Sequence, residues 1–444
     1  MARQADPAHA RTAALAIVRR LRERGHTAYF AGGCVRDELL GLAPTDYDVA
    51  TDATPDRIRA LFKRTAEVGA AFGVILVTPT PEEGAPDLPR PERPTVEVAT
   101  FRAEGPYSDR RRPDSVSFSD PKSDALRRDF TINALFLDPL SPGLPAPGSP
   151  ATVTETPHGA VIDYVQGLPD LHTRILRAVG DPEARLAEDH LRALRAVRLA
   201  ARLTLAIDPA TASAIQRHAR DLAGVSRERI GEEIRRMLAH DSRPRAITLL
   251  QQLSLDAPVL NEAPRPDSPL HLLTSSPLHS PSNALARHLA SWSLDRALTP
   301  TPDAIRDLTR RWRAALCLSN DESSGLRAIL LNLHLLEGPW PTLATAQQKR
   351  AIAAAGDHFL HALDLLTSRS PPAAATVRQR LADLTATPSG ICPEPLLTGD
   401  DLVAMGLPPG PSYKKLLDRV YDAQLEDRIA TPDAARELAR SLRI

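Results

Sequence analysis

The sequence predicts an α+β protein, in which a small mixed β-sheet at the N-terminal end is followed by an extended, all-helical remainder. Short runs of apolar residues, some alternating with polar ones, recur up to about residue 140 and are typical of strands. From about residue 170 onward, apolar residues recur with helical spacing. At 444 residues the chain is also too long for one ordinary domain, so we expect several successive parts.

The first part should alternate between short helices and strands. Residues 8–24 have helical spacing that ends at Gly25, and Thr54 with Pro55 is a typical start of a second helix. Strands are expected within residues 27–33, 45–51, 72–78 and 95–101. Two segments rich in proline interrupt this pattern. Residues 79–94 are predicted to be a solvated hairpin tip or a disordered insert, and residues 141–160 a connector.

The remainder is predicted to be helical, with helices within residues 187–203, 227–240 and 244–253 and a Pro/Ser/His-rich linker at 256–283. Further helices follow, broken near residue 371 and again at the GLPPGP stretch, residues 406–411. Trp292, Trp312 and Trp340 are expected to serve mainly in packing. Four domains result: a head at 1–160, a neck at 161–245, a body at 246–380 and a tail at 381–444.

Composition excludes some classes of protein. The formal net charge is zero, so the chain is not a global polycation, although local basic patches stay possible. Cys34, Cys317 and Cys392 form neither a metal-ligand pattern nor a disulfide framework. The N-terminus lacks the apolar core of a signal peptide, and no apolar run approaches the ~20 residues of a membrane helix. We therefore expect a soluble, cytoplasmic protein.

Three carboxylates are expected to converge on one face of the sheet. Because alternate residues of a strand share a face, Asp46 and Asp48 should project together. If the strand that contains Glu97 is a neighbour, the trio suits two Mg²⁺ ions about 4 Å apart. The upstream turn of Gly32 and Gly33 would let a triphosphate approach the backbone. The alternative is that this Asp-x-Asp lies in an ordinary solvated turn.

The stretch GGCVRDELLG, followed by TDYDVAT at residues 45–51, resembles the signature of the DNA polymerase β nucleotidyltransferase superfamily. More narrowly, it resembles the class II tRNA nucleotidyltransferases (CCA-adding enzymes) and the related bacterial poly(A) polymerases. The resemblance implies a nucleotidyltransferase head in which Asp46 and Asp48 bind the metals and Glu97 is the third catalytic carboxylate. Phosphate and metal surroundings are implied for Gly32, Gly33, Arg36 and Asp37.

A second motif, RRDFTINAL at residues 127–135, resembles the family element that recognises the ribose of the incoming nucleotide. The resemblance assigns Arg127, Arg128, Asp129 and Asn133 to nucleotide binding. The chemistry agrees, because Asp129 could accept a hydrogen bond from a 2′-hydroxyl and Arg128 could hold phosphate or sugar. Taken alone, the motif could equally be a helix cap stabilised by ordinary ion pairs.

A third motif, AEDHLRALRAVRLAARL at residues 187–203, resembles the family's nucleotide-selecting element. Asp189 and Arg192 are expected to be neighbours on one helix, and the plain alternative is a surface salt bridge. Arg only donates and Asp only accepts, so the pair complements cytosine and adenine, whereas uracil and guanine present the opposite groups. Arg195 and Arg198 are assigned to nucleotide binding with them.

Further motifs follow in the family's order. Asp163, Gly167 and Asp170 match a hinge-like element, and residues 226–238 match the last neck motif. Residues 101–118 resemble the flexible loop of CCA- and A-adding enzymes, except that Arg110 replaces a usual glycine. His240 and Asp241 lack the partners of a phosphohydrolase site. RNA binding is predicted for Arg227, Arg229, Lys414 and Lys415.

The resemblance implies template-independent addition of CMP and AMP, as a 3′-terminal CCA, to tRNA from CTP and ATP. The alternatives are an enzyme that adds only the terminal A, a poly(A) polymerase, and an inactive RNA-binding protein. The expected partners are the tRNA acceptor arm and the two nucleotides, with Mg²⁺ as cofactor and no membrane. The sequence does not indicate an oligomeric state.

Overall fold

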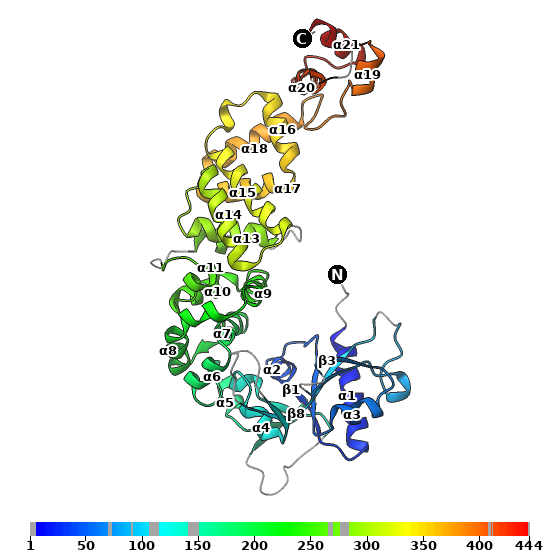
Figure 1. Cartoon of the computed structure of the whole chain (residues 1–444), viewed down its shortest axis with the longest axis vertical. Helices are drawn as coiled ribbons and strands as arrows, with labels where there is room; N and C mark the ends of the chain where they lie inside the picture. Colours follow the sequence, from blue (N-terminus) through cyan, green and yellow to red (C-terminus); the bar gives the residue numbers. More distant parts are fainter. Residues whose placement is uncertain are drawn as a thin grey trace. The chain divides into compact units, whose positions relative to one another are not determined.

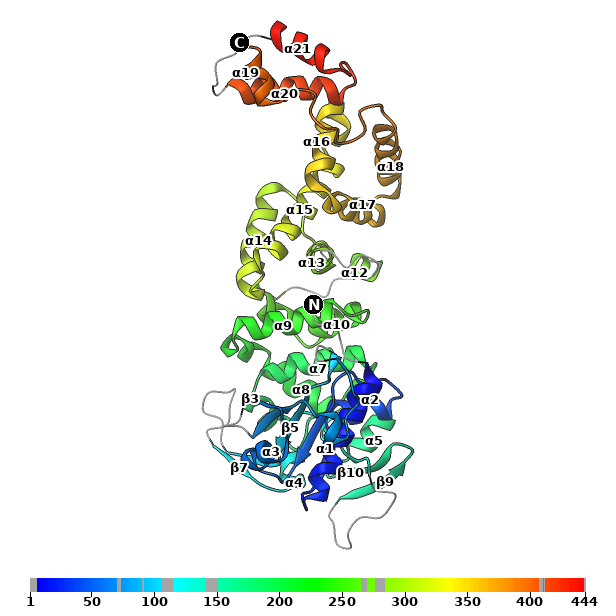
Figure 2. The same cartoon turned by 90° about the vertical axis from the view of Figure 1, so that its right-hand side faces the viewer.

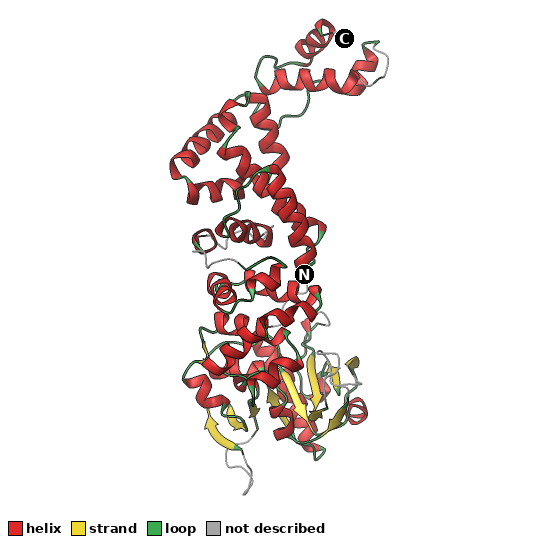
Figure 3. Ribbon diagram, turned by 60° about the vertical axis from the view of Figure 1, so that its left-hand side comes forward, coloured by secondary structure: helices red, strands yellow, loops and turns green. Residues whose placement is uncertain are grey.

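A computed structural model describes residues 6–69, 73–89, 92–105, 115–140, 151–264, 270–275, 284–406, 410 and 412–442. The chain divides into two compact units (Figure 1). The first comprises Met1–Glu233 and Arg245–Pro258, and the second comprises Ile234–Pro244 and Val259–Ile444. The strands drawn in Figure 3 all belong to the first unit, which confirms the predicted α+β class with its N-terminal mixed sheet.

The first unit is built on an eight-stranded sheet in the order β3-β4-β5-β2-β1-β8-β10-β9. β2 and β5 are parallel, and the other neighbours in this sheet are antiparallel. The sheet strands are β1 Ala28–Ala31, β2 Asp48–Thr51, β3 Thr65–Gly69, β4 Val74–Val77, β5 Val96–Thr100, β8 Phe136–Asp138, β9 Thr152–Thr156 and β10 Gly159–Asp163.

Helices cover the sheet, as Figures 1 and 2 show. α1 (Pro7–Glu23) packs on β1, β2 and β5, and α3 (Pro55–Leu61) packs on β4 and β5. α2 (Gly33–Leu39) contacts β1, and α4 (Pro121–Leu126) contacts the β6–β7 ribbon through β6 (Arg102–Glu104), which pairs with β7 (Val116–Phe118). An apolar cluster that includes Ala50, Phe101 and Phe136 lies on the face of β2 that also carries Asp48.

The structure corrects two predictions for the proline-rich segments. The β4 and β5 strands are antiparallel neighbours, so residues 79–94 do join a hairpin. The segment nevertheless packs: Thr80 and Glu83 are buried and form a capping box around η2 (Pro81–Glu83). The predicted connector at 141–160 contains β9 and the start of β10 instead, because Thr-Val-Thr-Glu-Thr alternates like an edge strand. Residues 141–150 lie outside the described part.

The predicted neck is helical, with two short parallel strands. Its elements are α5 Gly167–His172, β11 Ile175–Leu176, α6 Pro182–Glu188, α7 Leu191–Arg202, β12 Ala206–Ile207, α8 Pro209–Arg217, η5 Ala219–Gly224, α9 Arg227–Leu238 and α10 Arg243–Gln252. Both α9 and α10 contribute to the two compact units. The 3-10 turn η4 (Thr131–Asn133) contacts α5 and α2, and thereby links the neck to the sheet.

The remaining helices are α11 Asp256–Leu260, α12 His271–Ser275, α13 Ala284–Asp295, α14 Pro302–Leu316, α15 Asn320–Glu337, η6 Trp340–Thr342, α16 Thr345–Ala355, α17 Asp357–Arg369, α18 Pro371–Thr385, α19 Gly399–Ala404, α20 Ser412–Leu425 and α21 Pro432–Ser441. The predicted linker at 256–283 therefore includes two short helices. Trp292 and Trp312 are buried side by side, which confirms their predicted packing role. None of the described helices combines the length and apolarity needed to span a membrane.

Candidate functional site

The three predicted carboxylates come from two neighbouring strands. Asp48 is the first residue of β2, and it lies in register with Glu97 of the parallel strand β5. Asp46 lies outside the strand, in the turn before it, which corrects the prediction that both aspartates begin a strand. The expected alternation still holds, because Tyr47 is buried against Phe30 while Asp46, Asp48 and Glu97 are exposed. The sheet therefore presents Asp48 and Glu97 side by side, and Asp46 is close enough to contribute to the raised pKa of Asp48.

Asp48 shows the electrostatic cost of this arrangement. Although the residue reaches solvent, it lies deep against surrounding protein, and burial together with the charge of Glu97 raises the pKa of Asp48 to about 6. Asp46 adds to this effect, and Arg128 opposes it. Closely spaced carboxylate oxygens of this kind are the ligand set that a hard divalent cation prefers. The residues present therefore fit a metal ion.

The glycine turn lies next to the carboxylates. Gly32 has a φ of +76°, and a Cβ at this position would meet Arg128 Nη1 at 2.9 Å. Its N–H donates to the carbonyl of Leu135 at 3.2 Å, so this N–H already serves the protein's own backbone. The glycine is required for its backbone conformation and for the approach of Arg128. The predicted contribution of the Gly32 N–H to a phosphate cradle is not supported by this geometry.

A pocket of about 650 Å³ opens beside Asp48. Among its described lining residues are eight arginines and three aspartates, so its walls are strongly cationic. The described residues that line it are Gly32, Gly33, Arg36, Asp48, Arg102, Arg127, Arg128, Asp129, Asn133, Asp189, Leu191, Arg192, Arg195, Arg198, Leu199 and Arg229. Such a surface suits a polyanion that also has a flat, partly polar base, such as a nucleoside triphosphate.

Two arginines of the second motif are held by one buried carboxylate. Asp124 of α4 accepts from Arg127 at 2.6 Å and from Arg128 at 2.9 Å. Burial alone would raise the pKa of Asp124, but the two guanidinium groups outweigh it and lower that pKa. The alternative of ordinary helix-end ion pairs is thus partly right for Arg127 and Arg128. Both side chains nevertheless line the pocket.

Asp129 and Asn133 connect the head with α7. Asp129 Oδ1 accepts from the Phe130 N–H and from Asn133, while Oδ2 accepts twice from Arg195, at 2.9 and 2.7 Å. Burial raises the pKa of Asp129, but Arg195 and Asn133 outweigh this and lower it to about 2. The side-chain oxygen of Asn133 accepts from Arg36, which also pairs with Asp37. The predicted ribose acceptor Asp129 therefore already accepts four hydrogen bonds.

The structure corrects the geometry expected for the nucleotide-selecting motif. Asp189 lies at the junction of α6 and α7 with an extended backbone, so it does not share a helix with Arg192. The Asp189 carboxylate accepts from Arg229 at 2.6 Å and from the Leu191 N–H at 3.0 Å. Arg192 Nη1 donates instead to Glu188 and to the carbonyl of Arg185. Asp189 and Arg192 both line the pocket, but as separate groups.

The residues predicted to bind RNA lie in three different structural environments. Arg229 belongs to the pocket, and Arg227 donates to the carbonyl of Pro258 from both terminal nitrogens. Lys414 and Lys415 are exposed in the first turn of α20.

The GLPPGP residues 407–409 and 411 lie outside the described residues, as do residues 106–114, which include Arg110 of the predicted flexible loop. Arg198 pairs with buried Glu233 at 2.6 Å on the pocket wall.

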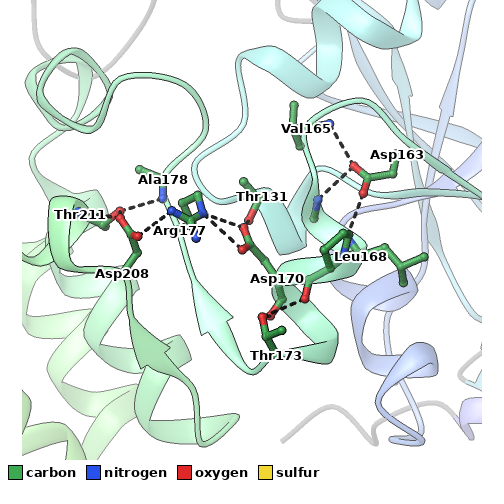
Figure 4. Close-up of polar contacts among 12 residues, drawn as sticks. Thr131, Asp163, Val165, Leu168, Asp170, Thr173, Arg177, Ala178, Asp208 and Thr211 are labelled. Atoms are coloured by element: carbon green, nitrogen blue, oxygen red, sulfur yellow. Dashed lines mark hydrogen bonds and ion pairs between the residues drawn. The ribbon is translucent and has the colours of Figure 1, made fainter. Parts of the chain in front are cut away.

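The hinge-like motif forms hydrogen bonds around the start of α5 (Figure 4). Asp163 accepts from the backbone N–H groups of Val165, Gly167 and Leu168, and so caps the start of α5. A Cβ on Gly167 would lie 2.1 Å from the carbonyl oxygen of Thr131 in η4. Only glycine allows this approach, which places α5 directly beneath the turn that carries Asn133.

A second part of this motif continues into the neck (Figure 4). Asp170 accepts from the hydroxyl of Thr131 at 2.7 Å and from Arg177 at 3.1 Å. Arg177 also donates to Asp208 at 2.6 Å, ahead of α8. Thus one continuous polar network connects η4 to α8. Arg177 and Asp208 were not predicted, because neither belongs to a local pattern.

Sequence reasoning missed three other residues at the pocket. Asp124 precedes Arg127 and Arg128 by three and four residues, and Glu188 precedes Arg192 by four, so helical spacing could have identified both carboxylates. Arg102 of β6 lines the pocket without a comparable signal in the sequence. Its position depends on the pairing of β6 with β7 and on the packing of β6 against α4.

Comparisons with known proteins show which families and proteins the chain is similar to. Residues 28–177 match the family described as "Poly A polymerase head domain", and residues 204–264 match "Probable RNA and SrmB- binding site of polymerase A". The chain is 31% identical to a CCA-adding enzyme of Lacticaseibacillus paracasei over 97% of this chain and 95% of that protein. It is 32% identical to one of Geobacillus kaustophilus, over 94% and 93%. A crystal structure of the Bacillus stearothermophilus CCA-adding enzyme in complex with CTP has a TM-score of 0.69 and 27% identity, and covers 97% of both chains.

Proposed function

The chain belongs to the family of CCA-adding enzymes, and from this premise we propose how its pocket adds CMP and AMP to the 3′ end of tRNA, with CTP and ATP as substrates. One observation carries the proposal. Asp48, which is in register with Glu97, lines a cationic pocket that Asp189 and Arg192 also line. Carboxylates for metal, cations for phosphate and hydrogen-bonding groups for a base are thus combined in one cavity.

Asp46, Asp48 and Glu97 would hold the metal, and we propose two Mg²⁺ ions because all three ligands are carboxylates. When bound, Mg²⁺ would lower the pKa of the attacking 3′-hydroxyl and stabilise the leaving pyrophosphate. The buried side of this segment supports the ligands. Tyr47 donates to buried Glu38, which also accepts from Arg11 at 2.8 Å. This network fixes the backbone between the two aspartates.

Arg36, Arg127 and Arg128 are proposed to bind the triphosphate. Each of the three lines the pocket. Arg36 donates to the side chain of Asn133. Arg127 donates to Asp124, and Arg128 donates to Asp124 and to the carbonyl of Asn133. A guanidinium group that is already ordered loses little rotamer entropy when a phosphate binds. Because Asp129 is saturated with donors, we assign it to positioning Arg195 in the pocket rather than to accepting from the ribose.

Base selection is assigned to Asp189 and Arg192. Each Asp189 oxygen accepts one hydrogen bond and can accept another from the exocyclic amino group of cytosine or adenine. Nε and Nη2 of Arg192 have no partner in the described part of the chain, so they can donate to the ring nitrogen or carbonyl oxygen of these bases. Uracil and guanine would place a carbonyl against Asp189 and an N–H against Arg192, and both are disfavoured.

The tRNA acceptor arm is the proposed RNA partner, and the cytoplasm the proposed location. Exposed Lys414 and Lys415 would contact its phosphates, which would make their effect dependent on salt and largely independent of tRNA sequence. Arg227 and Arg229 are no longer assigned to this surface, because the first packs on a carbonyl and the second orients Asp189.

The test is an extension assay at single-nucleotide resolution. Purified protein with Mg²⁺ receives tRNAs that end before CCA, after C and after CC, as well as an unstructured RNA, with each nucleotide alone and with CTP and ATP together. We expect growth by three nucleotides on the first tRNA, followed by a stop. Addition only to the CC-ending tRNA would indicate an A-adding enzyme. Long adenosine ladders on the unstructured RNA would indicate a poly(A) polymerase, and no incorporation would contradict the assignment.

A further inference from the structure

A second group of potential metal ligands lies in the neck, apart from the carboxylates of the sheet. His190, His218 and Asp221 come from the α6–α7 junction, the end of α8 and the turn η5, respectively. One ligand atom of each lies within 4.8 Å of the others. The three residues are separated by up to 31 positions in the sequence, so this convergence is produced by the fold.

Both ring nitrogens of His218 already lie next to carboxylates, which fixes the orientation of the imidazole. His218 Nδ1 lies 2.7 Å from Asp221, and its Nε2 lies 2.9 Å from Glu183 of α6. The centroids of the His190 and His218 imidazole rings are 5.6 Å apart. His190 is buried, whereas His218 and Asp221 reach solvent, so an ion can enter from one side.

We propose that His190, His218 and Asp221 bind one Zn²⁺ ion, or a cation with similar ligand preferences such as Co²⁺, in the neck. Two imidazoles and one carboxylate are typical ligands of Zn²⁺ or Co²⁺, with water in the remaining position, whereas Mg²⁺ prefers oxygen ligands. Binding requires His218 to release the proton from Nδ1 and to keep the one on Nε2, which it donates to Glu183. A carboxylate behind a ligating histidine is the usual arrangement around protein-bound zinc.

Glu183 is itself oriented for this role. Arg217, the neighbour of His218, donates to Glu183 from Nε at 2.7 Å. Glu183 would therefore keep Arg217 as a cationic partner when metal binding leaves His218 uncharged. The ion would join the α6–α7 junction to η5, and this junction also carries Asp189, the residue before His190. The proposed role is to stabilise the segment that presents Asp189 to the pocket.

The metal-free alternative is a histidinium that simply bridges Asp221 and Glu183. A titration with Co²⁺ distinguishes the two, because four-coordinate Co²⁺ absorbs strongly in the visible range. The full-length protein is stripped with a chelator and titrated in excess Mg²⁺, which occupies oxygen-only sites. Zn²⁺ is then added as a competitor. We expect one equivalent of Co²⁺ with tetrahedral absorption bands, displaced by one equivalent of Zn²⁺.

Variants assign the signal to these residues. His218→Gln should abolish stoichiometric binding, while His172→Gln, at an exposed histidine of the same unit, should leave it unchanged. Asp46→Asn/Asp48→Asn should also retain it, which separates this site from catalysis. Glu183→Gln keeps all three ligands and should weaken Zn²⁺ binding about 10–100-fold. Circular dichroism would check that each variant is folded. Absence of the bands in the parent protein, or equal binding by a folded His218→Gln variant, would overturn the proposal, whatever the extension assay shows.

Discussion

Asp189 is paired with Arg229, forty positions later in the chain, and not with Arg192, three positions later. The distance from Arg229 Nη2 to the Asp189 carboxylate is 2.6 Å. The carboxylate proposed to select the base is therefore oriented by α9, while Arg192 is oriented by Glu188. Each half of the proposed selecting pair has its own support, and this makes the two halves separately testable.

Arg229→Ala should relax the choice of nucleotide. Without this hydrogen bond, Asp189 is free to rotate, and a charged hydrogen bond of about 1.5–3 kcal/mol corresponds to roughly 10–100-fold in discrimination. The measurement is the ratio of kcat/KM for CTP and UTP in single-nucleotide addition. Arg227→Ala on the same helix is the control, because Arg227 contacts the Pro258 carbonyl. Unchanged discrimination in a folded Arg229→Ala protein would contradict this role.

Asp48→Asn should reduce turnover by about 100-fold or more while CTP binding is largely kept. The substitution removes one negative charge from the proposed metal ligands but leaves the arginines of the pocket in place. Single-turnover extension and equilibrium binding of CTP are measured on the same preparation. Asp56→Asn, at an exposed carboxylate of α3, should resemble the parent protein. Near-parent turnover of Asp48→Asn would show that another group performs its function.

Gly32→Ala should impair activity beyond its effect on stability. Alanine at the φ of +76° and ψ of −128° of Gly32 is strained by about 1–3 kcal/mol, and its Cβ would also displace the guanidinium of Arg128. Gly25→Ala provides a matched control, because Gly25 has a φ of +81° and nothing within 4 Å of the added Cβ. Both variants should unfold at lower denaturant, but only Gly32→Ala should raise the KM for CTP and ATP. Equal KM values would contradict the contact with Arg128.

The second unit should lose stability on mild acidification. Burial, together with Arg243 and Arg287, lowers the pKa of His288 from 6.5 to about 4, and the pKa of nearby His361 is lowered as well. Between these pH values the unfolded chain binds more protons than the folded one, so stability falls as the pH decreases from about 6.5 to about 4. One such histidine contributes at most about 1.4 kcal/mol per pH unit.

Urea unfolding at pH 7 and pH 5 would measure this effect. Tryptophan fluorescence reports on the second unit, because Trp292, Trp312 and Trp340 all belong to it. His288→Gln should reduce the difference between the two pH values, whereas His172→Gln in the first unit should preserve it. An identical pH dependence in the parent and His288→Gln proteins would assign the effect to other groups.

The convergence of the carboxylates was predictable because it depends on a local rule. Side chains of a strand alternate between faces, so Asp46 and Asp48 share a face even though β2 begins only at Asp48. The pairing of Glu97 with Asp48 was a conditional expectation, and the parallel register confirmed it. Residues 152–156 alternate in the same way, but Pro150 and Pro157 on either side are typical of a connector and obscure β9.

Helical spacing predicted that Asp189 and Arg192 share one helix, whereas the structure has a break at Asp189. Helical spacing runs through the stretch Ala-Glu-Asp-His-Leu-Arg, and the break between α6 and α7 has one local signal, Asp189, whose carboxylate accepts from the Leu191 N–H as a helix-capping side chain does. The bond from Arg229 also holds the Asp189 carboxylate at this break, and it joins residues that no local pattern connects. Propensities are worth a few tenths of a kcal/mol per residue, and such tertiary contacts override them.

The sequence by itself determined the α+β class, the family resemblance and the chemical types of the site residues, because all of these depend on composition, short-range periodicity and the order of motifs. The tertiary structure decided which groups are partners: Arg195 with Asp129, Arg36 with Asn133, Arg229 with Asp189. These pairs join residues 40 to 97 positions apart. Their geometry arises only when the sheet, η4 and the neck helices pack together, which no local spacing rule describes.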